Sequence, residues 1–228
     1  LGPRQVGKTT LIKSLLEARE EKFVEFNGDE PDIRVLLDSP SSGKLKNLIG
    51  NNKIVFIDEA QRISNIGLTL KLIVDRIPEV QVIASGSSSL DLAAGTFEAL
   101  TGRKYEFSLY PLSWSELASH NGVLEEHRYL EHRLVYGGYP EVVTSPGEEE
   151  EVLKELAGSY LYKDLLSLEE LRKPAILERL LSALALQLGS EVSYNELAAT
   201  VGSDNETVGR YIELLEKTFV IFKLPAFS

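Results

Sequence analysis

The phosphate-binding motif near residue 1 constrains the fold more than any other feature of this sequence. Residues 2–9 read Gly-Pro-Arg-Gln-Val-Gly-Lys-Thr and match the pattern G-x-x-x-x-G-K-T. Its glycines let backbone N–H groups converge on one phosphate chain, and its lysine brings a positive charge to the β- and γ-phosphates. Its threonine hydroxyl is a hard oxygen ligand that suits Mg²⁺. The predicted nucleotide-binding residues are Gly2, Pro3, Arg4, Gln5, Val6, Gly7, Lys8, Thr9 and Thr10.

The residues after this loop have the pattern of an amphipathic helix over 9–16. The N-terminal end of such a helix is positive and favours phosphate groups. The alternative is a Gly-rich turn that only precedes an ordinary helix.

A second motif occupies residues 53–61, which read Lys-Ile-Val-Phe-Ile-Asp-Glu-Ala-Gln, and its Asp58 lies 50 residues after Lys8. The apolar run predicts a strand buried on both faces, and open α/β sheets bind ligands at the carboxyl edge of such strands. We expect Asp58 and Thr9 to hold Mg²⁺, and Glu59 to activate the attacking water as catalytic base. The alternative is a pair of acidic residues where the chain leaves the core. The two motifs together predict a nucleoside-triphosphate site.

The composition excludes several other kinds of protein. The chain of 228 residues has ordinary hydrophobic (43%) and charged (26%) fractions and no cysteine, which excludes disulfides and thiolate metal sites. It contains no apolar run that would span a bilayer, so we expect a cytoplasmic protein without a membrane partner. The histidines His120, His127 and His132 lack ligand-like spacing and are expected on the surface. Methionine is also absent and only Leu1 precedes the loop, so we expect a piece of a longer protein that lacks its first strand.

Strands alternate with helices over residues 1–111. Apolar runs predict strands at 23–26, 54–57 and 80–84 and helices at 45–49 and 63–74, while 32–37 is ambiguous and 105–109 alternates like another strand. This order predicts an α/β fold of the P-loop NTPase type, with a parallel sheet sandwiched by helices. We expect a P-loop ATPase core at 1–111.

Two further residues complete the predicted catalytic set, which consists of Glu59, Lys8, Ser87 and Arg103. Ser87 lies with Ser85 and Ser88 in a turn after the strand at 80–84, where a hydroxyl would sense the γ-phosphate or hold the water; ordinary turn chemistry is the alternative. Arg103 would be an arginine finger, acting within the chain or on a neighbouring subunit. The alternative for Arg103 is a solvated turn residue.

The second half of the sequence is mostly helical. Residues 112–189 predict a helical lid or linker that begins at the capping box Ser113–Glu116, bends at 136–140 and ends after a helix over 174–188. Residues 190–228 predict a helix-turn-helix-like or winged-helix module, with a wing strand over 219–224. DNA is a disfavoured partner, because most of the net charge of −11 lies in residues 111–228.

The segments GPRQVGKTTL, IVFIDEAQ, ASGSSSL, LTGRKYEFSLYPLSWSE, YGGYPEV and LPAFS together resemble the prokaryotic predicted ATPases of the AAA+ superfamily. Those proteins carry an AAA-type core followed by a C-terminal domain of unknown function. The resemblance implies ATP and Mg²⁺ at Lys8, Thr9 and Asp58, with Glu59 as the base. It also implies that Ser87 is the polar sensor, that Arg103 matches the Gly-Arg pair of the family, and that the C-terminal domain is cut short here.

The leading functional hypothesis is an ATPase whose hydrolysis cycle acts as a conformational switch on an unknown protein client. Assembly into a homo-oligomer is left open. The rival hypothesis is a nucleotide-gated DNA-binding regulator with little turnover. A GTPase is weaker because no guanine-recognition signature is present, and the Asp58–Glu59 pair favours water activation over a small-molecule kinase.

Overall fold

The computed structural model describes residues 1–87, 100, 102–160 and 174–225. The chain divides into two compact units, residues 1–149 and 150–228, and each is considered by itself. Ser88 lies outside the described residues, and so do Leu161 and Leu165, whose spacing with Leu153, Leu156 and Tyr160 predicts the apolar face of one helix. Among the residues that are described, no helix is long and apolar enough to cross a membrane.

The first unit contains a three-stranded parallel sheet, as the alternation of strands and helices predicts. Its strands β1 (Phe23–Asn27), β2 (Ile54–Asp58) and β3 (Gln81–Ala84) lie in the order β1-β2-β3. Asn27 is opposite Asp58, and Ile57 is opposite Ala84. The carboxyl ends of all three strands therefore meet at one edge, which brings the ends of the sequence motifs together.

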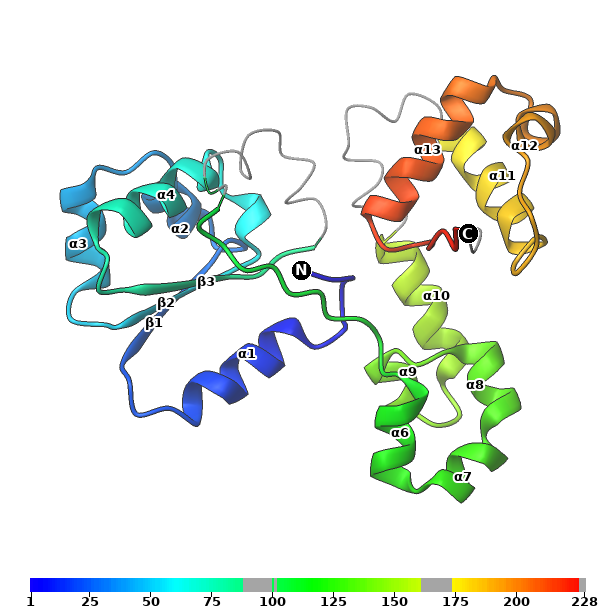
Figure 1. The fold of residues 1–228 in the computed structure, drawn as a ribbon, viewed down its shortest axis with the longest axis horizontal. Helices are drawn as coiled ribbons and strands as arrows, with labels where there is room; N and C mark the ends of the chain where they lie inside the picture. Colours follow the sequence, from blue (N-terminus) through cyan, green and yellow to red (C-terminus); the bar gives the residue numbers. More distant parts are fainter. Residues whose placement is uncertain (88–99, 101, 161–173, 226–228) are drawn as a thin grey trace. The chain divides into compact units, whose positions relative to one another are not determined.

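Helices cover both faces of this sheet, as expected for a P-loop NTPase-like fold (Figure 1). They are α1 (Lys8–Glu17), α2 (Pro31–Leu37), α3 (Ser42–Ile49) and α4 (Ile66–Arg76), with a short 3₁₀ helix η1 (Ala60–Arg62) after β2. The ambiguous segment at 32–37 is thus helical. Pro31 at the first position of α2 favours that outcome, because its fixed φ suits the start of a helix.

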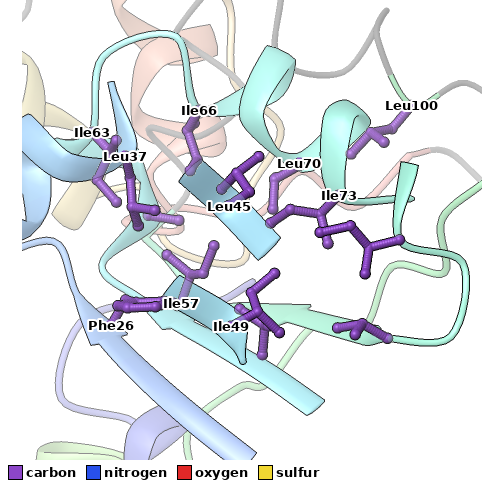
Figure 2. Packing of buried hydrophobic residues seen from close by; sticks show 14 residues of the cluster. Phe26, Leu37, Leu45, Ile49, Ile57, Ile63, Ile66, Leu70, Ile73 and Leu100 are labelled. Atoms are coloured by element: carbon purple, nitrogen blue, oxygen red, sulfur yellow. The ribbon is translucent and has the colours of Figure 1, made fainter. Parts of the chain in front are cut away.

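Every residue of β2 is buried, and its side chains alternate between two clusters. Val55 and Ile57 face a large cluster with Leu37, Leu45, Ile49, Ile66 and Ile73 from α2, α3 and α4 (Figure 2). Ile54 and Phe56 face the other side, where Leu16 of α1 covers them. Each fully buried side chain of this kind contributes roughly 1.5–3 kcal/mol. β2 is consequently the rigid centre from which Asp58 and Glu59 emerge.

The predicted strand at 105–109 is not formed as a strand. Among the described residues its backbone pairs with Leu1, whose N-terminal amine donates to the carbonyl of Phe107 and whose own carbonyl accepts from the N–H of Leu109. Tyr105 and Phe107 are 92% and 79% exposed, so the alternating pattern does not bury a face here. One paired residue does not make a ladder, which is why the prediction was wrong over this range.

In the described residues after 111, the first unit continues with short helices, which are α6 (Trp114–Asn121), α7 (Val123–Arg128), α8 (Leu130–Tyr136) and α9 (Pro140–Thr144). The predicted capping box at the start of α6 is confirmed, because Ser113 and Glu116 exchange hydrogen bonds. The predicted bend separates α8 from α9. Gly137 there has φ of 77°, a left-handed conformation that glycine adopts without strain.

The second unit is helical, with α10 (Glu149–Tyr160) starting at its boundary, then α11 (Pro174–Ala185), α12 (Tyr194–Val201) and α13 (Asn205–Lys217). Fully buried side chains hold α11, α12 and α13 together: Leu180, Leu197, Val201, Val208, Tyr211 and Leu215. Helices α12 and α13 have the predicted helix-turn-helix connection. The turn is made by Gly202 in the left-handed conformation, and Asp204 caps α13 through the N–H of Thr207.

Two expectations for this unit were wrong. No strand forms over the described residues 219–225, so the predicted wing is missing from that stretch. The helix predicted to reach Leu188 ends at Ala185, and the last two leucines of the predicted range, Leu186 and Leu188, are 90% and 82% exposed, so they do not extend its buried face.

Candidate nucleotide site

The loop before α1 has the backbone conformation that its glycines predict. Gly7 is the N-cap of α1 with φ of 87°, and Gln5 also has positive φ (58°), which is a strained conformation for a residue with a side chain. The Nζ of Lys8 donates to the carbonyl oxygens of Gly2 at 3.0 Å and Pro3 at 2.6 Å. Lys8 is 8% exposed, so the loop folds around the ammonium group and holds its charge inside the cradle.

Asp58, at the end of β2, joins the loop to the sheet. Its Oδ2 accepts a hydrogen bond of 2.8 Å from the hydroxyl of Thr9, and its Oδ1 accepts one from the hydroxyl of Ser85, just after β3. Asp58 and Ser85 are both buried. Carboxylate and hydroxyl oxygens are the donors that Mg²⁺ prefers, so the pair Asp58–Thr9 fits a magnesium ion. The described residues include no cluster of three or more His, Cys, Asp or Glu that could hold a metal.

The backbone of Glu59 is held by the turns beside it. Glu59 has φ of 47°, which is unusual outside glycine and recurs at functional sites. On one side the N–H of Gly28 donates to the carbonyl of Asp58 at 2.8 Å, and a Cβ on Gly28 would lie 2.3 Å from the carbonyl oxygen of Glu59. On the other side the N–H of Ala60 donates to the carbonyl of Ser85 at 3.0 Å. The turns after β1 and β3 thus fix the position of the Glu59 backbone, from which its side chain extends.

The side chain of Glu59 contacts a residue that the sequence patterns did not single out. The Nε2 of Gln61, on η1, donates to Oε2 of Glu59 and to the hydroxyl of Ser87 at 3.3 Å. Ser87 is 4% exposed. Gln61 therefore links the predicted base to the predicted sensor. Its place two residues after Glu59 in the motif was the only signal available from the sequence.

Lys8, Thr9, Asp58, Glu59 and Ser87 lie in one connected set of loops, but Arg103 does not join them. Arg103 forms an ion pair with Asp75, near the C-terminal end of α4, and both side chains are partly exposed. Because α4 connects β2 to β3 in a parallel sheet, its C-terminal end lies at the amino edge, away from Glu59. Within one chain, then, Arg103 is not brought to the phosphate loop in this conformation.

A short segment also connects the loop to the helices that follow. A Cβ on Gly2 would lie 2.1 Å from the carbonyl oxygen of Leu109, and a Cβ on Gly138 would lie 2.2 Å from that of Leu112. The N–H of Leu112 donates to the carbonyl of Gly138 at 2.7 Å. We name residues 109–112 the connecting segment. It touches the phosphate loop at one end and the bend between α8 and α9 at the other.

Comparisons with known proteins give relatives for nearly the whole chain. It is 28% identical over 226 residues to an uncharacterized protein of Mycobacterium bovis and equally to one of Mycobacterium tuberculosis, covering 98% of this chain and 48% of each relative. It is 27% identical to an uncharacterized protein of Haemophilus influenzae, covering 100% of this chain and 62% of that protein. The chain thus spans between about half and three fifths of the length of these relatives.

Two solved structures resemble the chain more distantly. They are AMPPCP-bound DnaA from Aquifex aeolicus (16% identity, TM-score 0.38, 95% of this chain and 80% of that one) and the Holliday junction branch migration motor RuvB of Thermotoga maritima (18%, 0.35, 98% and 80%). Scores of this size do not establish a common overall arrangement.

Family models match almost the entire sequence in two adjoining parts. Residues 1–118, which include the loop, the sheet and the connecting segment, match the model of an AAA domain. Residues 127–228 match a domain of unknown function. The chain therefore belongs to the AAA domain family, with a nucleotide-binding ATPase-type core followed by a C-terminal domain of unknown function.

Proposed function

We propose that the protein binds ATP with Mg²⁺, hydrolyses it, and uses the cycle as a conformational switch on a protein client. The observation that supports this most strongly is the 2.8 Å hydrogen bond between Thr9 and Asp58. It joins one residue from each motif, 49 positions apart in the sequence, and these are the two side chains with the oxygen chemistry that Mg²⁺ requires.

Each residue of the site has a role in this proposal. Lys8 would leave the carbonyl oxygens of Gly2 and Pro3 and pair with the β- and γ-phosphates. A magnesium ion held by Asp58 and Thr9 would neutralise charge on the same phosphates. Glu59 would take a proton from a water molecule as the water oxygen bonds to the γ-phosphorus, while ADP leaves with the electron pair of the broken bond. Ser87 would contact the γ-phosphate.

The connecting segment supports the switch part of the proposal. Its Leu109 lies against Gly2 of the phosphate loop, and its Leu112 is bonded to Gly138 between α8 and α9. When the loop moves on binding or losing a γ-phosphate, Leu109 and Leu112 would have to move with it. The bend between α8 and α9 would then shift as well, because both backbone contacts are too tight for either partner to stay in place. The helical part of the first unit is where we propose that the nucleotide state is read.

Arg103 enters the proposal as a residue that acts on another subunit. It is paired with Asp75 at the edge of the sheet opposite Glu59, so a role within its own chain would need a large rearrangement. A homo-oligomer would bring Arg103 of one copy to the phosphates of the next, at the cost of one partly exposed ion pair. Such pairs contribute about 0–1 kcal/mol, so this cost is small.

The decisive experiment combines calorimetric titration with ATP and Mg²⁺ and a phosphate-release assay on the same preparations. We expect Lys8→Ala to lose both binding and turnover, and Glu59→Gln to bind ATP but lose about 10²–10⁴-fold in kcat. Lys13→Ala and Glu79→Gln are matched controls. Lys13 lies on the same helix but pairs with Glu25 at 2.9 Å, and Glu79 is exposed before β3. No heat of binding for the unmodified protein, or normal turnover by Glu59→Gln, would refute the assignment.

A further inference from the structure

Gln61 occupies a position between the two predicted catalytic side chains. It lies on η1, directly after β2, and its amide nitrogen donates to Glu59 and to Ser87. Ser87 follows β3, so this one amide joins side chains from the ends of two neighbouring strands. Both hydrogens of the amide group are used in these two bonds, since an NH₂ group has two donors.

The orientation of this amide follows from the chemistry of its partner. An ionised carboxylate only accepts hydrogen bonds, so the amide must turn its nitrogen, and not its oxygen, towards Glu59. The consequence is visible on the other side of the group. The Oε1 of Gln61 is buried and has no hydrogen-bond partner among the described residues. Leaving a buried acceptor unpaired is unfavourable, so the two donor bonds to Glu59 and Ser87 hold the amide in this orientation against that cost.

We propose that Gln61 is a positioning residue that orients the Glu59 carboxylate and ties it to Ser87, so that base and sensor act as one unit. This inference rests on the proposed function. With Oε2 of Glu59 bound to the amide, the carboxylate cannot rotate freely, and its other oxygen, Oε1, remains to accept the proton of the attacking water. A shift of Ser87 on contact with a γ-phosphate then changes the position of Glu59 through the same amide.

A role limited to stability makes a different prediction. An amide that only fills space between η1 and the turn after β3 would affect folding and nucleotide affinity together, and its effect would not depend on Glu59. A positioning residue lowers kcat while leaving the dissociation constant of ATP unchanged, because it acts on the attacking water and not on binding. Its effect also disappears once Glu59 can no longer act as a base.

The experiment measures ATP affinity by calorimetry and kcat by single-turnover hydrolysis of radiolabelled ATP. Gln61→Ala removes the amide, and Gln61→Met removes the donors while keeping the length of the side chain, which covers the case in which the alanine variant fails to fold. Gln81→Ala is the matched control, because Gln81 is an exposed glutamine at the opposite end of β3. We expect both Gln61 variants to lose about 10–100-fold in kcat with ATP affinity within about twofold of the unmodified protein, and the control to keep its kcat.

A double-mutant cycle completes the test. In a Glu59→Gln background, adding Gln61→Met should produce no further loss of kcat. If the unmodified protein hydrolyses ATP but Gln61→Met keeps its full kcat, or if its loss adds to that of Glu59→Gln, this inference is overturned and the proposed function remains. If the unmodified protein itself shows no turnover, the proposed hydrolysis fails first and takes this inference with it.

Discussion

Gly2 and Leu109 pack backbone against backbone, so closely that a methyl group on Gly2 would lie 2.1 Å from the Leu109 carbonyl oxygen. Nothing flexible is available to move away, because the neighbouring atom belongs to the main chain. We therefore expect Gly2→Ala to displace the phosphate loop from Leu109, which would lower ATP affinity at least tenfold and reduce the melting temperature. Calorimetric titration and thermal unfolding would measure the two effects.

A matched glycine provides the control for that prediction. Gly43 lies near the start of α3, where a methyl group in place of its hydrogen would have no other atom within 4 Å, and its φ is ordinary. Gly43→Ala should stabilise the fold by up to about 1 kcal/mol, because alanine favours a helix over glycine. Equal behaviour of the two alanine variants would mean that the contact with Leu109 does not constrain the loop.

Gly138→Ala tests the other end of the connecting segment. The added methyl group would lie 2.2 Å from the carbonyl oxygen of Leu112, so the bend between α8 and α9 must move. We expect this variant to keep ATP binding but to lose the nucleotide-dependent change in amide hydrogen exchange over 130–144. If Gly138→Ala shows the same difference in hydrogen exchange with and without nucleotide as the unmodified protein, the connecting segment does not couple the phosphate loop to the helices.

Ser85→Ala should affect the response to magnesium more than the binding of nucleotide alone. The hydroxyl of Ser85 donates to Oδ1 of Asp58, and hydrogen bonds to charged groups are worth about 1.5–3 kcal/mol. Without it the buried carboxylate is less firmly oriented towards Thr9. We expect a several-fold higher Mg²⁺ concentration for half-maximal ATP binding, measured by titrating Mg²⁺ at fixed ATP. Ser119→Ala is the control, because Ser119 is an exposed residue of α6 whose hydroxyl donates to the backbone of its own helix.

Glu126 and Arg133 form a buried ion pair that makes the stability of the first unit dependent on pH. Arg133 donates twice to the Glu126 carboxylate at 3.1 Å, and Asn121 donates at 2.7 Å. The hydrogen bond from Arg133 is the largest cause that holds the pKa of Glu126 below its ordinary value of 4.5, and burial opposes it. A carboxyl group with a lowered folded-state pKa contributes its full stability above pH 4.5, and that contribution is lost as the pH falls through the folded-state pKa.

Because the pKa of Glu126 is lowered in the folded protein, removing its charge should destabilise the first unit most at neutral pH. Glu126→Gln should lower the free energy of unfolding by about 1.5–3 kcal/mol at pH 7, and the difference from the unmodified protein should shrink as the pH is lowered below about 4.5. Urea unfolding at about pH 7 and about pH 3.5 would measure it. Glu125→Gln is the control, because Glu125 pairs with Arg128 on the surface, where both side chains are at least half exposed. A pH-independent difference would refute the role of the charge.

The helix-turn-helix pair should not bind DNA by charge attraction. The exposed surface of α13 carries Glu206 and Glu213, and Lys217 is already paired with Glu213 at 2.8 Å. Lys223 is paired in turn with Glu216 at 2.5 Å. We expect no salt-dependent binding of a short duplex at low ionic strength, with or without ATP. Binding that weakens steeply with added salt would instead favour a DNA-binding regulator.

Local sequence patterns were sufficient to predict most elements of the first unit. The four β-branched or aromatic residues before Asp58 predict β2, because such a short run is typical of a strand covered on both faces, and all five residues of β2 are buried in the structure. The glycines and Lys8 predict the loop, and Ser113 with Glu116 predicts the start of α6, because these signals act over a few residues. The domain boundaries at 111 and 189 and the roles of the site residues stay predictions.

Contacts between distant residues were beyond the reach of such patterns. The alternation at 105–109 resembles a strand, but a strand exists only where a partner pairs along its length, and in the described part of the chain this segment pairs with the single residue Leu1. Whether Phe219–Leu224 forms a wing likewise depends on a partner, which local propensity does not supply. Arg103 shows the same limit, since its distance from the phosphate loop depends on the direction in which α4 crosses the sheet.

The sequence by itself identifies the residues suited to bind phosphate and magnesium, because charge, hydroxyl chemistry and glycine conformation are properties of single residues. The bond from Gln61 to Glu59 and Ser87, and the contact of Gly2 with Leu109, depend instead on how three parallel strands and their turns pack. The contacts of Gln61 with Ser87 and of Gly2 with Leu109 join residues that lie 26 or more positions apart, so they form only after the chain has closed loops of that length.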